Sequence, residues 1–226
     1  MLARDPEPKH ESEHENHNSF EINDYMIDLD PVSMLNFEER SFLSVFKERR
    51  SARAFYPLTY SDLSKFLIVT HQLIHSDKTS SSLDIEHQPA MSSGGLQAIT
   101  PLLKVVSDEH RWFKYQNTQH TMIAIDGQAD TLGEYLNEVN ENLKLNGAIP
   151  IVYAGDLKRL SGKYENPDSL LWRDAGVMMN IHAMAATYLG LTYSPVGQLG
   201  QPIISDLKGC SRSVIGCGIA ILGGPP

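Results

Sequence analysis

Three arginines lie within five residues in the segment Arg49-Arg50-Ser51-Ala52-Arg53. The planar guanidinium group of arginine binds phosphate oxygens through two parallel hydrogen bonds. The segment ends an apolar-periodic stretch and precedes Phe55-Tyr56-Pro57, so an ordered helix end would hold the arginines in place. From these residues alone two interpretations stay open. The arginines form a site for a small anion, or they are surface cations that stabilise a helix C-terminus.

The rest of the chain is acidic, with a formal net charge of -9 over 226 residues. Binding nucleic acid requires a basic surface that neutralises phosphates, so this charge argues against a general nucleic-acid binder. The arginine segment is therefore a local exception, which favours a specific small anion. Apolar residues make up 41% and charged residues 21% of the chain, which is normal for a globular domain.

Cysteine content and hydropathy indicate the compartment. Cys210 and Cys217 are too few for a disulfide framework, and their spacing is not a metal or redox motif. No stretch approaches the roughly 20 apolar residues of a membrane span, and no secretory signal is visible. We therefore expect a cytoplasmic protein with no membrane partner.

The composition changes near residue 22. Residues 1–22 are rich in glutamate and histidine and lack apolar periodicity, which predicts a disordered acidic tail. His10, His14 and His17 are metal-ligand types, but their unpatterned polar surroundings favour a tail, and we predict no metal site. Residues 23–226 are expected to form a single domain.

Periodicity predicts alternating helices and strands in that domain. Helices are expected at 36–50, from Thr59 onward with a Thr-x-x-Asp capping box, at 132–143, and at about 166–190. Strands are expected at 102–106, 112–115, 121–125, 148–154, 191–194 and 214–222. The last helix is apolar nearly all round, which predicts a central helix or a subunit interface. Helices and strands mixed without regular β-α-β alternation predict an α+β fold.

Two turns are rich in small residues. Ser92-Ser93-Gly94-Gly95 precedes an expected strand, and Ser194-Pro195-Val196-Gly197-Gln198 follows the longest expected helix. Small residues let the backbone approach a flat ligand closely and direct amide groups at it. A flexible linker is the alternative interpretation of the first turn. Placed with the arginines around one sheet, the two turns would form a cofactor cradle.

The pattern Arg-Arg-Ser-x-Arg-x-Phe at residues 49–55 resembles the FMN-dependent nitroreductase superfamily, and the resemblance covers roughly residues 46–222. Residues 89–98 look like the flavin-proximal loop of that family. Ser93-Gly94-Gly95 followed by Pro101 is similar to the SagB-type branch. The resemblance implies a nitroreductase-like three-layer fold, in which helices flank a central mixed, mostly antiparallel sheet. It also implies a long buried central helix and a homodimer.

The resemblance further implies FMN as cofactor and assigns residues to it. Arg49, Arg50, Ser51 and Arg53 would bind the phosphate and the pyrimidine edge, Ser92, Ser93 and Gly94 would lie along the isoalloxazine, and Pro195, Val196, Gly197 and Gln198 would lie near its N5 edge. Many relatives add a basic pair near the C-terminus. This chain ends Gly223-Gly224-Pro225-Pro226, and its nearest cations are Lys208 and Arg212. How the phosphate site is completed is therefore open.

A Lys163-Tyr164 pair stands immediately before the longest expected helix. SagB-type azoline dehydrogenases carry a Lys-Tyr pair at the corresponding place, so the resemblance implies that Lys163 and Tyr164 are catalytic. Oxidising an azoline ring to an azole removes a proton and a hydride. The flavin accepts the hydride, and the protein must supply a base for the proton. A surface dipeptide is the alternative. Asp174, on the helix, is expected to anchor an arginine or a backbone amide.

These features predict an FMN-dependent dehydrogenase that oxidises azoline rings to thiazoles or oxazoles. The substrate would be a ribosomally synthesised, post-translationally modified peptide such as a bacteriocin precursor, and a cyclodehydratase would be a partner. One alternative is an FMN-dependent NAD(P)H nitro- or enone reductase, which needs no Lys-Tyr pair. Another is a flavin-free scaffold subunit of a peptide-modifying complex, because the C-terminal basic pair is missing.

Overall fold

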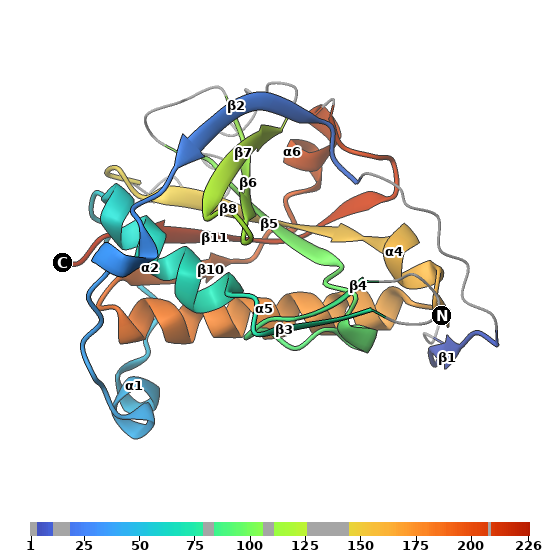
Figure 1. Ribbon diagram of the computed structural model, residues 1–226, viewed down its shortest axis with the longest axis horizontal. Helices are drawn as coiled ribbons and strands as arrows, with labels where there is room; N and C mark the ends of the chain where they lie inside the picture. Colours follow the sequence, from blue (N-terminus) through green and yellow to red (C-terminus); the bar gives the residue numbers. More distant parts are fainter. Residues whose placement is uncertain (1–3, 11–18, 79–83, 106–110, 126–144, 208) are drawn as a thin grey trace.

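The computed structural model describes residues 4–10, 19–78, 84–105, 111–125, 145–207 and 209–226, and its centre is a seven-stranded antiparallel sheet (Figure 1). The strand order is β10-β11-β8-β5-β6-β7-β2. These strands are β2 (Ile22–Asp28), β5 (Ile99–Leu103), β6 (Phe113–Gln116), β7 (Thr121–Ile125), β8 (Ile149–Asp156), β10 (Thr192–Val196) and β11 (Val214–Gly223). β8 is buried along its whole length, which explains its uninterrupted apolar sequence.

Helices cover both faces of this sheet. They are α1 (Phe42–Glu48), α2 (Tyr60–His71), α4 (Leu157–Ser161), α5 (Asp168–Tyr188) and α6 (Gln201–Asp206), with short 3-10 turns η1 (Val32–Met34) and η2 (Ser93–Gly95). Alternate residues of β8 separate two cores: Ile151 and Tyr153 pack with α2 and α5, whereas Val152 and Ala154 pack with α6. Outside the large sheet, β1 (Glu7–Pro8) pairs with β9 (Tyr164–Glu165), and β3 (His75–Lys78) pairs with β4 (Asp84–His87). None of the described helices is long and apolar enough to cross a membrane.

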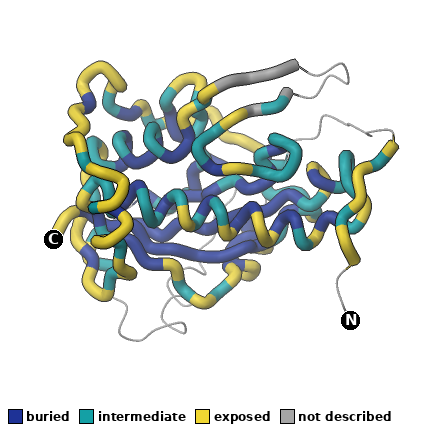
Figure 2. Tube along the Cα trace, turned by 90° about the horizontal axis from the view of Figure 1, so that it is seen from below, coloured by how far each residue is buried: buried dark blue, intermediate teal, exposed yellow. Residues whose placement is uncertain are grey.

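The long helix α5 is buried on one face only. Residues at helical spacing, including Leu171, Ala175 and Met178, pack toward the sheet. Residues at the opposite face, such as Gly176 and Asn180, are exposed, and Figure 2 shows exposed positions recurring along this helix. The expectation of a helix that is buried all round is therefore wrong for a single chain, as far as the described residues show, because none of the described elements covers these exposed positions.

The cap expected for the second helix is confirmed, whereas the start expected for the first helix is wrong. The Thr59 hydroxyl accepts a hydrogen bond from the amide of Asp62 at 3.1 Å, as the capping box predicts. The first helix begins after Ser41 rather than near residue 36, because the Ser41 hydroxyl accepts from the Ser44 amide at 3.1 Å. The helix expected at 132–143 lies outside the described residues.

Parts of the expected tail pack on the domain. Glu7–Pro8 forms β1, and Phe20 is buried and forms an isolated β-bridge with Cys210. The amide of Glu21 donates to the carbonyl of Gly209 at 2.7 Å. Backbone pairing and one buried ring leave no periodic pattern in a sequence, which explains why these contacts were not predicted. Residues 11–18 lie outside the description.

A buried chain of titratable rings lies in the core between α2 and α5. The Tyr153 hydroxyl is 2.7 Å from both His182 Nδ1 and the Tyr193 hydroxyl. The His71 ring lies 5.1 Å from the His182 ring, and its Nδ1 is 2.7 Å from the Thr70 hydroxyl. Burial lowers the pKa of His71 to about 4 and lowers the pKa of His182 well below its usual value. Both imidazoles are therefore neutral at pH 7.

We expect this core to make the protein sensitive to acid. Below pH 6.5 an unfolded chain protonates His71, whereas the folded chain does not until about pH 4, so stability falls as pH drops through that window. At pH 4.5 the loss from His71 alone is about 2 to 3 kcal/mol. Urea unfolding at pH 7 and 4.5 measures it. His71→Phe should reduce the loss, whereas exposed His87→Phe should not; equal losses in both variants would contradict the assignment.

Candidate functional site

The Lys163-Tyr164 pair lies against the Ser-Gly turn, although the two are almost 70 residues apart in sequence. The chain leaves α4 through a tight turn in which the Lys163 amide donates to the Leu160 carbonyl at 3.0 Å. Lys163 Nζ then lies 3.4 Å from the carbonyl oxygen of Gly94. The structure thus brings together two of the residue groups that the sequence singled out.

The backbone conformation at position 94 favours glycine. Its φ of +64° is favoured for glycine, and a Cβ there would lie 2.8 Å from both Lys163 Nζ and the Tyr164 hydroxyl. The polar ends of the lysine and tyrosine side chains therefore converge on one backbone position. Lys163 and Tyr164 are both half-buried.

Asp174 of α5 fixes the Ser-Gly turn from below. Its Oδ2 accepts from the Ser93 amide and its Oδ1 from the Ser93 hydroxyl, both at 2.8 Å. Burial raises the pKa of the Asp174 carboxyl, and the two hydrogen bonds from Ser93 partly oppose that shift. The expectation that Asp174 anchors a backbone amide is confirmed, and its partner is the turn that carries Gly94.

Asp174→Asn is expected to loosen this turn. The amide side chain offers one oxygen instead of two, so one of the two Ser93 donors loses its acceptor at a cost of about 1 to 3 kcal/mol. Urea unfolding should show this loss, and the Ser93 amide should exchange its hydrogen faster. Asp168→Asn, exposed in the first turn of the same helix, is the matched control. Unchanged exchange at Ser93 would contradict the anchoring role.

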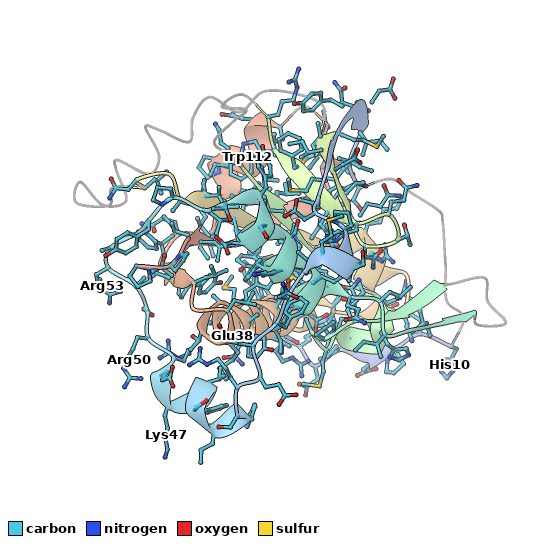
Figure 3. All side chains as sticks on the ribbon, turned by 60° about the vertical axis from the view of Figure 1, so that its left-hand side comes forward. His10, Glu38, Lys47, Arg50, Arg53 and Trp112 are labelled. Atoms are coloured by element: carbon cyan, nitrogen blue, oxygen red, sulfur yellow. The ribbon has the colours of Figure 1, made fainter. Side chains whose placement is uncertain are left out.

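The arginine segment lies at the other end of α5. The Ala52 amide donates to the Tyr193 carbonyl at 2.9 Å, which places the segment beside edge strand β10. Arg50 and Arg53 are exposed and point away from the body of the molecule (Figure 3). The side-chain hydrogen bonds found for them go to backbone carbonyls, and within the described part of the chain neither pairs with a carboxylate. These guanidinium groups therefore retain donors for an external anion.

Arg40 connects this segment to α5 and was not identified from the sequence. Its guanidinium donates to the Thr187 carbonyl at 2.7 Å and pairs with Glu48 of α1. A cation at the last carbonyls of a helix is favourable, and here it also holds α1 against the helix end. No spacing pattern links residues that are almost 150 positions apart, so sequence inspection could not find this contact.

The second small-residue turn belongs to the arginine end. Val196 of β10 and Ala52 both pack against the small cluster of Phe55, Ala148 and Ile221. Beyond β10, the Oε1 atom of Gln198 is buried without a hydrogen-bond partner among the described residues. A buried free acceptor suits a ligand that presents an N–H group.

The predicted site residues therefore form two groups in one chain. Asp174, beneath the Ser-Gly turn, and Thr187, beneath Arg40, are about 20 Å apart along α5. In Figure 3, Arg50 and Arg53 lie on one side of the molecule and His10, close to Lys163 in the fold, on the other. Arg212 precedes the start of β11, whereas the arginine segment lies near its end, so Arg212 does not complete that group.

Comparisons with known proteins address the fold. No protein-family model matches the sequence, and no curated protein matches it. A protein from Ralstonia eutropha JMP134 named as a nitroreductase has a similar structure, with a TM-score of 0.70 at 14% identity over 96% of this chain and 98% of the other. A chain of the E. coli microcin synthetase McbBCD complex with truncated pro-MccB17 bound gives a TM-score of 0.56 at 14% identity over 88% and 84%.

A third similar structure is named as a nitroreductase in complex with FMN from Desulfovibrio desulfuricans, with a TM-score of 0.51 at 15% identity over 83% and 88% of the chains. These likenesses establish a nitroreductase-like α+β fold with a mostly antiparallel seven-stranded sheet. The fold expected from the resemblance is confirmed. At such identities the likeness concerns the fold alone.

Proposed function

We propose that the protein is an FMN-dependent dehydrogenase that oxidises azoline rings to azoles in a ribosomally synthesised, post-translationally modified peptide. One observation carries the proposal: Lys163 Nζ and the Tyr164 hydroxyl converge on Gly94, in the turn that the resemblance assigns to the flavin face. The fold supports it, because a protein named as a nitroreductase in complex with FMN and a chain of the microcin synthetase complex with truncated pro-MccB17 bound have a similar fold. A simple reductase has no need of such a pair.

The residues present suit FMN. Arg49, Arg50 and Arg53 would hold the phosphate, because Arg50 and Arg53 keep external donors and no carboxylate within the described chain neutralises them. Gln198 Oε1 offers a buried acceptor to a ring N–H. Bound FMN would supply a two-electron acceptor for the ring hydride.

The task of the protein is then to orient the azoline and to remove its ring proton. Loss of that proton and of a hydride from adjacent ring atoms introduces the second double bond of the azole. Lys163 and Tyr164 present an amine and a hydroxyl at one position, so one can accept the proton and the other can relay it to solvent. Asp174 maintains this geometry by fixing Ser93.

We further propose that the complete site forms between two copies of the chain. The arginine group of one copy would meet the Ser-Gly turn, Lys163 and Tyr164 of another, because these groups lie at opposite ends of α5 in one chain. An apolar surface suited to a partner is available on α1, where Phe42, Leu43 and Phe46 are 75%, 61% and 59% exposed. Neighbouring apolar side chains that are exposed to this degree are typical of an interface.

The proposal is tested by incubating the purified protein with FMN and an azoline-containing peptide. Mass spectrometry should show loss of two hydrogen atoms for each ring oxidised, and absorbance should show a flavin that copurifies or binds. No mass loss with several thiazoline and oxazoline peptides would overturn the proposed activity. A cyclodehydratase, which forms azolines, is the expected partner.

An NAD(P)H-dependent nitro- or enone reductase is the second candidate, favoured by the nitroreductase names of the structurally similar proteins. It predicts NAD(P)H oxidation with a nitroaromatic acceptor at a rate that Lys163→Ala leaves unchanged. A flavin-free scaffold subunit of a peptide-modifying complex is the other alternative. A colourless protein that binds no added FMN would overturn both oxidoreductase candidates.

A further inference from the structure

The N-terminal segment of the chain lies along the strand that carries Tyr164. β1 pairs with β9 in antiparallel register, with Glu7 opposite Glu165 and Pro8 opposite Tyr164. The Lys9 amide donates to the Lys163 carbonyl at 2.9 Å, so the segment bonds directly to the backbone of the proposed catalytic lysine. Figure 1 shows β1 beside α4, at the end of α5 opposite to α1.

The strand pairing of this segment is short. The pairing covers two residues on each strand, both residues of β1 are exposed, and Pro8 has no amide hydrogen to donate. The Lys9–Glu165 ion pair is long at 3.9 Å, and 63% of the Glu165 side chain is exposed, so the pair contributes little. A ladder this short is easily displaced by a competing strand.

We propose that the edge of β9 is a docking edge for an extended peptide substrate, and that residues 4–10 occupy it in the free enzyme as a built-in competitor. Strand addition uses main-chain hydrogen bonds for affinity and side chains for selectivity. The bound segment shows what the edge accepts: an extended strand, antiparallel to β9, with a basic residue near Glu165. A peptide in this register passes directly beside Lys163 and Tyr164.

The identity of that peptide as an azoline substrate rests on the proposed function, whereas the docking edge rests on the strand pairing. A strand that displaces residues 4–10 takes over the Lys163 carbonyl as hydrogen-bond acceptor. It then lies along the backbone of the two residues whose side-chain ends converge on Gly94. Substrate binding and release of the N-terminal segment are thus one exchange of strands.

The test uses the full chain and a fluorescein-labelled peptide with the sequence of residues 4–10. Lys9→Pro removes the amide that bonds Lys163 and should free the edge. We expect the labelled peptide to bind Lys9→Pro about tenfold more tightly than the unchanged protein, as loss of one competing hydrogen bond implies. Arg4→Glu, exposed and outside the pairing, is the matched control and should bind like the unchanged protein.

Two further arms decide the register. A labelled peptide with proline in place of Lys9 should bind neither the unchanged protein nor Lys9→Pro. A labelled peptide with glutamate in place of Lys9 should bind the Glu165→Lys, Lys9→Pro double variant more tightly than it binds Lys9→Pro. If the labelled peptide with the unchanged sequence of residues 4–10 binds the unchanged protein and Lys9→Pro equally, or binds neither, the proposal is overturned.

Measuring azole formation distinguishes a failure of the docking edge from a failure of the proposed function. If the protein forms azoles, Lys9→Pro should lower KM for the azoline peptide by a similar factor without changing kcat. Equal KM values would overturn the competitor role even though azoles form. Labelled-peptide binding that responds as expected, with no azole formed by either protein, would uphold the docking edge and reject the proposed function.

Discussion

Lys163→Met is expected to reduce azole formation by about 10²- to 10⁴-fold, the usual contribution of a positioned acid–base group. Methionine preserves the length of the side chain and removes the amine that lies 3.4 Å from the Gly94 carbonyl. The turn itself should persist, because Asp174 holds it through Ser93 and not through Lys163. Flavin absorbance and the urea midpoint should therefore stay unchanged while turnover falls.

Lys158→Met provides the control, since Lys158 is exposed on α4 only five residues earlier. Tyr164→Phe completes the series, because it keeps the ring that lies 5.9 Å from Lys163 Nζ and removes only the hydroxyl. Lys163→Met and Tyr164→Phe should both lose azole formation. Any NAD(P)H-dependent reduction that the unchanged protein shows should remain in both variants. Azole formation by Lys163→Met within about threefold of the unchanged protein would remove the lysine from the chemistry.

Elements with a burial pattern or a cap could be predicted from the sequence. β8 and β11 are long apolar runs because both lie inside the sheet, and the segment from Pro167 to Gly190 contains α5 with its helix-ending glycine. β2 was missed because it is an edge strand whose side chains are mostly exposed, so its sequence carries no burial pattern. β1 was missed because a strand of two residues is too short to show any periodicity in the sequence.

The candidate site shows a different limit. Residue types identified three groups as candidates: Arg49–Arg53, Ser92–Gly94 and the Lys163-Tyr164 pair. Residue types do not determine how far apart these groups lie in the folded chain. The contact between Ser93 and Asp174 joins positions 81 apart, and only the packing of α5 under the turn creates it. The same helix separates the arginines from the lysine, because its length places them at opposite ends.

Mixing two inactive variants is expected to restore activity if the site is shared between copies. Arg49→Glu/Arg53→Glu should abolish the phosphate site, and Lys163→Met should abolish the base, so each homodimer is inactive. In a mixed dimer one of the two shared sites receives both defects, and the other receives none. Random assortment makes half of the dimers mixed, so coexpression should recover about a quarter of the unchanged activity.

The geometry of the chain makes this result decisive. A site formed within one chain would leave every copy with one defect, and coexpression would recover nothing. Lys163→Met coexpressed with Gly94→Val is the control, because both positions lie at the same end of α5 and each mixed site keeps one defect. Recovery only with the arginine variant, together with a dimer by sedimentation, would show that the arginine group of one copy and the Lys163 group of another form one site.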